Sequence, residues 1–287
     1  MGLSSNILWH QTSFNVLKKI LRERQLKYAY SLESTFSIVN TTGVAFPMIS
    51  LCDLPLSELG SYLGKYGDYS IGFSKEWGER NKACPVWYCY DKGDVIEFIS
   101  RYYKTAATHQ NPEAIDFVIQ LLAYMKPVQG ALPKKSYKSY RFYDEREVRF
   151  VPENIDLKEG GRAPMLSSSD YDKYKQEHSG NSVLNFGVEF EWSDIKYIVV
   201  KEEQQIVRIK AFLDTLNCDN GNIIVFCSSQ IREDVIGIEH NVPIDKPDQN
   251  EIELGDRQLK AMRAIISGST SPDYWEVLLN GLENNQH

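Results

Sequence analysis

The 287-residue chain lacks the short motifs of several large enzyme classes. It contains no G-x-G-x-x-G, no G-x-x-x-x-G-K-[ST], no G-x-S-x-G and no H-E-x-x-H. Their absence argues against a Rossmann oxidoreductase, a P-loop NTPase, an α/β-hydrolase and a zincin. Its apolar runs are too short to cross a membrane, and its first residues lack the basic start and apolar stretch of a signal peptide. We therefore expect a cytoplasmic protein with no membrane partner.

Cysteine and histidine are both scarce, with five of each. The cysteine count is odd, no C-x-x-C occurs, and Cys84 and Cys89 lie in one predicted strand at a separation that points them to opposite faces. Free thiols in a reducing compartment are expected. No two histidines are closely spaced, so we expect no metal site; they are His10, His109, His178, His240 and His287.

The net charge of −7 argues against a surface built for non-specific nucleic-acid binding, but the charge is unevenly distributed. Residues 233–256 hold eight acids and a single lysine, which leaves the remainder neutral overall. A local basic patch lies within residues 134–149, and it is a candidate contact for a nucleic-acid or protein target. Its cations are Lys134, Lys135, Lys138, Arg141, Arg146 and Arg149.

Short strands mixed irregularly with helices predict an α+β fold rather than a doubly wound sheet. Strands are expected at 7–10, 26–30, 48–51, 69–73, 84–90, 147–151, 195–200 and 222–227. Helices are expected at 13–24, 56–65, 92–107, 112–125, 202–216 and 256–267, and a short turn or helix at 75–80. Glycine, proline and serine in 153–182 predict a loop insertion over the site. We expect one main domain over 1–238, followed by an acidic linker and a C-terminal helix over 239–287.

His10 is the first candidate functional residue, because it stands at the end of a short apolar strand, before a polar corner and a helix. Thr12 or Ser13 is the expected N-cap of that helix. Backbone N–H groups and a hydroxyl beside an imidazole can hold a ribose or a phosphate. The alternative is a structural hydrogen bond, which is the commoner role of a single histidine of this kind.

Two further segments concentrate residues with chemical uses. In the first, Gly72 lets a flat ligand approach the backbone, and Tyr69 or Phe73 could stack on it, although a buried strand with core aromatics explains the segment better on this pattern alone. In the second, Glu147 and Arg149 share one face of a strand, opposite Val148 and Phe150. A solvated charged edge is the commoner outcome for such a run. If Val148 and Phe150 point to the core, Glu147 stands where a cleft could lie.

Four segments together resemble the AbiGi family of bacterial abortive-infection proteins, in an order that spans roughly residues 7–200. They are Leu8-Trp9-His10-Gln11-Thr12-Ser13 with its following helix, Ile49 to Ser57, Tyr69 to Gly78, and Tyr143 to Arg149. The usual family motif has an aromatic in an E-W-R triplet, where this chain has Glu147-Val148-Arg149. The family is described as phage-resistance factors and is often labelled an antitoxin. The resemblance therefore implies a cognate toxin or antitoxin partner.

An L-[WF]-H-x-[TS] strand leading into a helix also resembles, more distantly, the ADP-ribosyltransferase superfamily of DarT-like and poly-ADP-ribose-polymerase-like enzymes. That resemblance implies a mixed β core with flanking helices and NAD as substrate. His10 and Thr12 would contact the nicotinamide ribose, Tyr69 or Ser50 would fill the middle position, and Glu147 would be the catalytic acid. Gly72, Phe73 and Arg149 complete the predicted NAD-binding set. We expect His10, Tyr69 and Glu147 to converge on one cleft.

Three hypotheses follow for function. The first is a phage-defence enzyme that transfers ADP-ribose from NAD to a macromolecule or hydrolyses NAD, with a fixed carboxylate stabilising oxocarbenium charge. The second is a non-catalytic antitoxin or regulator whose cleft is vestigial or binds a nucleotide without turning it over. The third is a nucleic-acid-binding module that works through the patch at 134–149.

Overall fold

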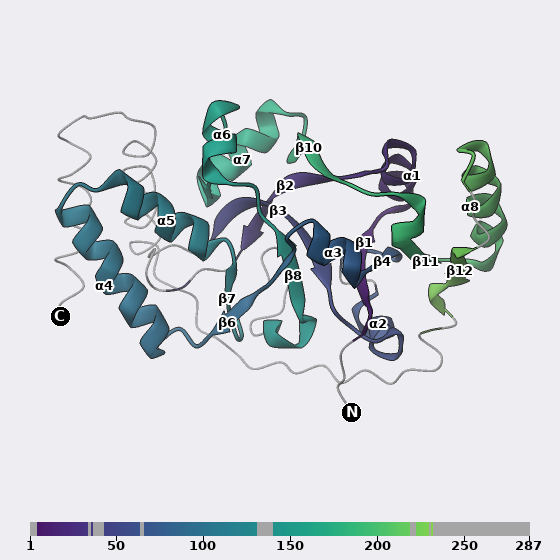
Figure 1. The fold of residues 1–287 in the computed structure, drawn as a ribbon, viewed down its shortest axis with the longest axis horizontal. Helices are drawn as coiled ribbons and strands as arrows, with labels where there is room; N and C mark the ends of the chain where they lie inside the picture. Colours follow the sequence, from purple (N-terminus) through teal and green to yellow (C-terminus); the bar gives the residue numbers. More distant parts are fainter. Residues whose placement is uncertain are drawn as a thin grey trace.

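The computed structural model describes residues 5–33, 36, 43–63, 66–130, 140–218, 222–229 and 231. Its strands are β1 (Ile7–Thr12), β2 (Gln25–Glu33), β3 (Val44–Cys52), β4 (Tyr69–Ser74), β5 (Cys84–Pro85), β6 (Trp87–Cys89), β7 (Met125–Pro127), β8 (Glu147–Phe150), β9 (Leu166–Ser167), β10 (Val183–Glu189), β11 (Ile195–Val200) and β12 (Ile224–Cys227). Its helices are α1 (Phe14–Glu23), α2 (Leu56–Tyr62), α3 (Lys75–Arg80), α4 (Asp94–Thr108), α5 (Pro112–Leu122), α6 (Asn154–Glu159), α7 (Ser168–Glu177) and α8 (Glu203–Thr215), with 3₁₀ helices η2 (Phe142–Glu145) and η3 (Trp192–Asp194). The predicted α+β class is confirmed (Figure 1).

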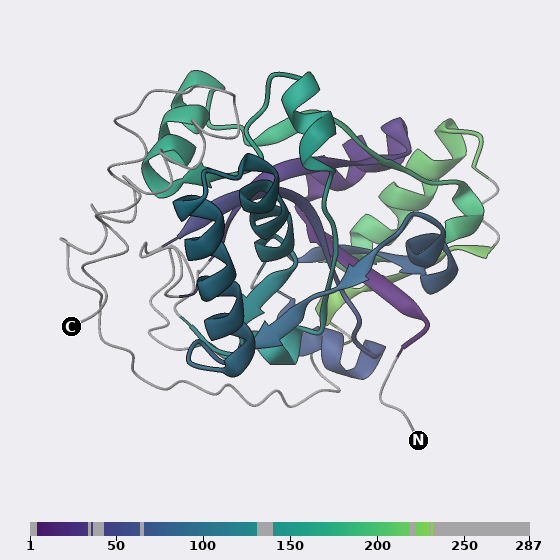
Figure 2. The same cartoon turned by 60° about the vertical axis from the view of Figure 1, so that its left-hand side comes forward.

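The main sheet is mixed and runs in the order β10-β2-β3-β1-β4-β11-β12. Its pairs are antiparallel except β11 with β12, which is parallel. β8 pairs with the second half of β3, from Ile49 opposite Phe150 to Cys52 opposite Glu147. Helices α4 and α5 pack at one end of the molecule and α8 lies at the other (Figures 1 and 2).

The sheet opens along β3, and this opening positions the site. β2 pairs with β3 only as far as Met48, whereas β1 pairs with β3 only at Cys52, opposite Trp9. Neither strand therefore pairs with residues 49–51 of β3. β1 runs instead along β4, and α1 carries the chain back to β2.

Apolar periodicity explains the elements around this opening. The spacing of Leu17, Ile20 and Leu21 predicted the buried face of α1, and all three are buried in the structure. The spacing of the apolar residues of α4 suggests one buried face, but in the structure only some of these residues are buried. Ile99 and Tyr103 enter a core with the first half of β3, while Phe98 and Tyr102 are exposed.

The prediction of a loop over 153–182 is wrong for most of its length. This stretch contains α6, β9 and α7, and Leu157, Leu166 and Tyr171 are buried in one cluster with Tyr30 of β2. Ser167 is the N-cap of α7, where its hydroxyl accepts a hydrogen bond from Asp170 N, so the serines mark a helix start and not a loop.

Other expectations differ from the structure in smaller ways. The strand expected over 84–90 is divided into β5 and β6, and β7 and β10 were not predicted. All five cysteines are free, as expected. The helix expected at 256–267 and the whole segment 239–287 lie outside the described residues. No helix within the described ranges is long and apolar enough to span a bilayer.

Candidate functional site: a charged groove at the opening of the sheet

A groove with a cavity volume of about 780 Å³ lies where β1, β2 and β3 separate. Residues of β1, α1, β2 and β3 line it. It is also lined by Tyr66, Lys126, Phe142, Glu145 and Glu147. His10, Gln11 and Ser50 also line the groove, so residues from distant parts of the chain meet there.

His10 reaches across the opening between β1 and β3. Its Nδ1 lies 3.1 Å from the carbonyl oxygen of Ser50. Because a carbonyl only accepts hydrogen bonds, His10 donates through Nδ1–H, and Nε2 is left as an acceptor. Burial lowers the pKa of His10, and the bond to Ser50 opposes that shift only in part. The ring is therefore neutral at physiological pH.

Glu147 faces the groove because of the period of two along β8. Val148 and Phe150 lie in the apolar core, which turns Glu147 and Arg149 to the other face, as their alternation predicted. The alternative of a solvated charged edge is wrong. Glu147 is only 5% exposed, and Arg149 is completely buried.

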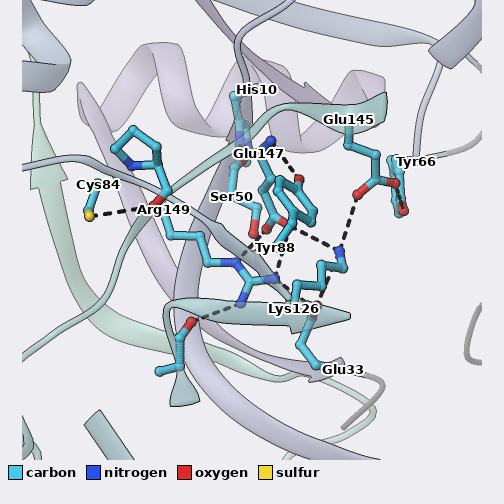
Figure 3. Close-up of polar contacts among 12 residues, drawn as sticks. His10, Glu33, Ser50, Tyr66, Cys84, Tyr88, Lys126, Glu145, Glu147 and Arg149 are labelled. Atoms are coloured by element: carbon cyan, nitrogen blue, oxygen red, sulfur yellow. Dashed lines mark hydrogen bonds and ion pairs between the residues drawn. The ribbon is translucent and has the colours of Figure 1, made fainter. Parts of the chain in front are cut away.

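Five buried or nearly buried charges form one cluster, drawn in Figure 3: Glu33, Lys126, Glu145, Glu147 and Arg149. Arg149 Nε lies 2.7 Å from Glu147 Oε1, and Arg149 Nη2 lies 2.7 Å from Glu33 Oε2. Lys126 Nζ lies 2.9 Å from Glu147 Oε2, 3.1 Å from Glu145 Oε2 and 3.4 Å from Glu33 Oε2. Three carboxylates thus face two cations, and the cluster carries one net negative formal charge.

The cluster sets the ionisation of its members. Burial alone would raise the pKa of Glu147, but Arg149 and Lys126 outweigh it and hold that pKa well below its usual range. Burial would likewise lower the pKa of Lys126, and the surrounding carboxylates reverse this and raise it. Both groups stay charged at physiological pH.

Several groove residues were not among those predicted from the sequence. Lys126 follows the helix expected over 112–125, and Glu33 lies in β2, outside the four segments that carry the family resemblance. Tyr66 lines the groove and donates a hydrogen bond from its hydroxyl to Glu145. Gln11 lies between two predicted site residues, and only the burial of its amide draws attention to it.

Five predicted site residues do not line the groove: Thr12, Tyr69, Gly72, Phe73 and Arg149, which lies behind Glu147. Phe73 is completely buried and stacks on Trp77, with 4.3 Å between the ring centroids. A Cβ atom at Gly72 would lie 2.8 Å from the ring of Trp9, so Gly72 makes room for that ring and not for a ligand.

The hydroxyl of Tyr69 lies 3.0 Å from Gln205 Nε2 on α8, and its ring contacts Phe14. Thr12 is buried opposite Tyr69 in the β1–β4 pair. The structure thus brings His10, Ser50 and Glu147 together, with Arg149 behind Glu147, and places Thr12, Tyr69, Gly72 and Phe73 elsewhere.

The expected basic patch over 134–149 loses part of its charge in the structure. Arg149 points inward, and Arg141 pairs with Asp144 at 3.2 Å. Lys134, Lys135 and Lys138 lie outside the described residues. Within the described part of the chain, no three potential ligands among His, Cys, Asp and Glu are placed to hold a metal ion.

The fold and the groove define an α+β protein with a split mixed sheet and a buried charge cluster at the split. Residues 15–201, more than half of the chain, match the family described as "Putative abortive phage resistance protein AbiGi, antitoxin". The chain belongs to this AbiGi family, as its motifs suggested. No curated protein and no solved structure matches it.

Proposed function

We propose that this protein is a regulatory, antitoxin-type component of an abortive-infection pair, and that its groove binds an NAD-type nucleotide without turning it over. The family description supports the abortive-infection role and the antitoxin role. The observation that carries the absence of turnover is the saturation of Glu147.

Glu147 has no acceptor position left for a substrate. A carboxylate accepts about four hydrogen bonds. Arg149 donates two of them through Nε and Nη2, Lys126 donates a third, and the Ser50 hydroxyl donates a fourth. A catalytic glutamate in an ADP-ribosyl transfer must instead hold the ribose 2′-hydroxyl and offer uncompensated negative charge to the oxocarbenium ion.

The size and charge of the groove support a nucleotide ligand. A cavity of about 780 Å³ falls in the range of about 300–1,000 Å³ that small-molecule and cofactor sites occupy. Lys19 and Lys27 line its α1–β2 end, and Glu23 pairs with Lys27 at 2.7 Å. The opposite end holds the cluster with net negative charge. An elongated ligand with phosphates at one end and a cationic ring at the other matches this distribution.

An ADP-ribosyltransferase or NAD glycohydrolase is the second candidate. One observation favours it: His10 and Glu147 line the same groove, on separate strands, with His10 Nε2 available as an acceptor. In this alternative, substrate binding would displace Lys126 or Ser50 from Glu147. The carboxylate would then be free for the ribose.

An antitoxin also needs a surface for its toxin. Val95, Phe98 and Tyr102 follow one another at helical spacing on the exposed side of α4, and Phe117 of α5 lies beside Tyr102 at 6.4 Å between ring centroids. Phe98 and Phe117 are 63% and 60% exposed. Exposed aromatic clusters of this kind are typical of protein-binding surfaces. We propose that the cognate toxin docks on this aromatic surface of α4 and α5.

NAD consumption and growth distinguish the two candidates. The purified full chain should bind NAD in calorimetry, release neither nicotinamide nor ADP-ribose, and leave the growth of cells expressing it alone unaffected. Turnover of NAD that is abolished by Glu147→Gln would refute the regulatory proposal in favour of the transferase.

The docking surface has a separate test. The double variant Phe98→Ser, Phe117→Ser should fold normally and fail to protect cells that co-express the cognate toxin. Val207→Ser is the control, because Val207 is an apolar residue at least as exposed, on α8 at the opposite end of the molecule. Full protection by the double variant would exclude the aromatic surface as the docking site.

A further inference from the structure

We infer that the acidic segment of this chain, residues 233–256, docks in a basic furrow between α1 and α8. The furrow is flanked by Lys18, Arg22 and Arg208. None of the three lines the groove, so the furrow is a separate surface. The inference therefore holds whether or not the groove binds a nucleotide.

Helices α1 and α8 lie side by side at one end of the molecule (Figure 1). Tyr69 of β4 joins them at one point, because its ring lies 5.4 Å from the ring of Phe14 on α1 and its hydroxyl lies 3.0 Å from Gln205 Nε2 on α8. Two turns further along α1, the guanidinium of Arg22 lies 5.6 Å from the ring centroid of Phe212 on α8. One flank of α1 therefore faces α8 along its length.

The helical period brings three cations to this furrow. Arg22 faces α8, and Lys18 stands one turn earlier on the same flank of α1. On α8, Arg208 stands between Gln205 and Phe212 at steps of three and four residues, so it shares the flank that faces α1. Lys18 is half-buried, and both arginines are exposed. The two helices thus present their positive charge toward each other.

The three cations have no carboxylate partner within the described part of the chain. Glu23 is the one acid of α1, and it pairs with Lys27 at 2.7 Å. Lys18 Nζ lies 4.8 Å from the ring centroid of Phe14, and Arg22 is held over a ring in the same way. Aromatic rings orient these cations and leave their N–H donors for an anion. An acidic partner would also relieve the repulsion among the three like charges.

The acidic segment offers the complementary charge. Residues 233–256 hold eight acids and a single lysine, and they lie outside the described residues. The segment follows shortly after Ile231, which is buried in a cluster with Val199 of β11, at the same end of the sheet as α8. An extended chain spans about 3.3 Å per residue, so the segment is long enough to pass the β12 edge and reach the furrow.

The tether makes weak pairs sufficient. An exposed ion pair strengthens binding by no more than about fivefold, so three such pairs contribute at most about a hundredfold. A flexible connection within one chain supplies an effective concentration in the millimolar range. The tethered segment therefore occupies the furrow in preference to an equally charged peptide at micromolar concentration.

Carbodiimide cross-linking of the purified full chain tests the contact, because the reagent joins an amine to a carboxylate only where the two touch. Mass spectrometry should find Lys18 joined to acids of 233–256, and NaCl at about 1 M should lower the yield at least about threefold. The double variant Arg22→Gln, Arg208→Gln keeps the Lys18 amine and removes two of the three cations. It should also lower the yield of this cross-link at least about threefold.

The control variant Lys92→Gln, Arg101→Gln removes two exposed cations elsewhere on the surface and should leave the yield unchanged. A mixture of isotope-labelled and unlabelled protein identifies which copy supplies the acids. Cross-links within one copy support the inference, and cross-links only between copies overturn it in favour of a second copy of the chain.

Two further results would overturn the inference. The first is the absence of any cross-link from Lys18 to 233–256, or a yield that the variant Arg22→Gln, Arg208→Gln leaves unchanged. The second is binding of duplex DNA that this variant abolishes, without the cross-link in the wild type, which would identify the furrow as a nucleic-acid surface. Both substitutions lie at exposed positions, so the variant should fold as the wild type does.

Discussion

Replacing Glu147 with glutamine removes the negative charge that Arg149 and Lys126 share. Removing one partner of a buried ion pair lowers the free energy of unfolding by about 3–5 kcal/mol. Here Arg149 keeps Glu33 at 2.7 Å and Lys126 keeps Glu145 at 3.1 Å, so the loss falls at the lower end of that range. We expect Glu147→Gln to lower the free energy of unfolding by about 3 kcal/mol. For a chain of this size, that corresponds to a fall of about 6–12 °C in Tm.

The pH dependence of stability identifies the cause of that loss. The folded-state pKa of Glu147 is depressed, so its contribution is complete above the unfolded value of about 4.3 and declines as pH falls toward the folded value. The difference between wild type and variant should therefore be constant from about pH 5 to 7 and shrink below about pH 4.

Urea unfolding, followed by the fluorescence of the buried Trp9 and Trp77, measures this difference. The control Glu177→Gln, at an exposed position, should stay within about 0.5 kcal/mol of wild type. A Glu147→Gln protein as stable as this control at pH 7 would refute the account of the cluster.

Two further predictions concern β1 and its neighbours. His10 should titrate in NMR with a midpoint below 6.5 and carry its neutral-form proton on Nδ1, because burial disfavours the charged ring and the Ser50 carbonyl accepts from that atom; a midpoint above 6.5 would contradict this environment. Gly72→Ala should lower the free energy of unfolding by about 1–3 kcal/mol, because the added Cβ would lie 2.8 Å from Trp9 and 2.9 Å from Ile7. Thermal unfolding measures the second effect, and an unchanged Tm would show that the Trp9 ring and the Ile7 side chain move aside without cost.

Helices and strands with strong apolar periodicity could be predicted from the sequence. A helix whose residues are mostly polar, such as α7, could not. α1 and β11 were predicted close to their observed bounds, because burial dictates the spacing of their apolar residues. The sequence of α7 predicts a loop, because Tyr171 is its only buried residue and most of its other residues are polar. The stability of α7 depends on the Ser167 cap and on contacts with β2 and β3, which are distant in sequence.

The predicted site shows a similar limit. Alternation along β8 determines which face Glu147 and Arg149 occupy, and this was predicted correctly. Whether that face meets water or protein depends on Lys126 and Glu33, which come from β7 and β2. A period of two says nothing about which distant strands approach. The prediction that Phe73 of β4 stacks on a ligand was wrong, and the alternative that it fills the core was right. The sequence pattern does not distinguish these two roles of an aromatic residue.

The charge cluster also changes what the motif from Tyr143 to Arg149 implies. Ion pairs join Glu145 of η2, and Glu147 and Arg149 of β8, to Lys126 of β7 and Glu33 of β2. These pairs alone would require an acid at position 147 and a base at position 149. The motif is thus explained by structure without catalysis. His10 and Gln11 of β1 line the groove outside that ion-pair network. No structural contact explains the Nε2 atom of His10 or the side-chain amide of Gln11 in the described part of the chain. Ligand recognition in this protein should therefore depend more on β1 than on the acid of the late strand.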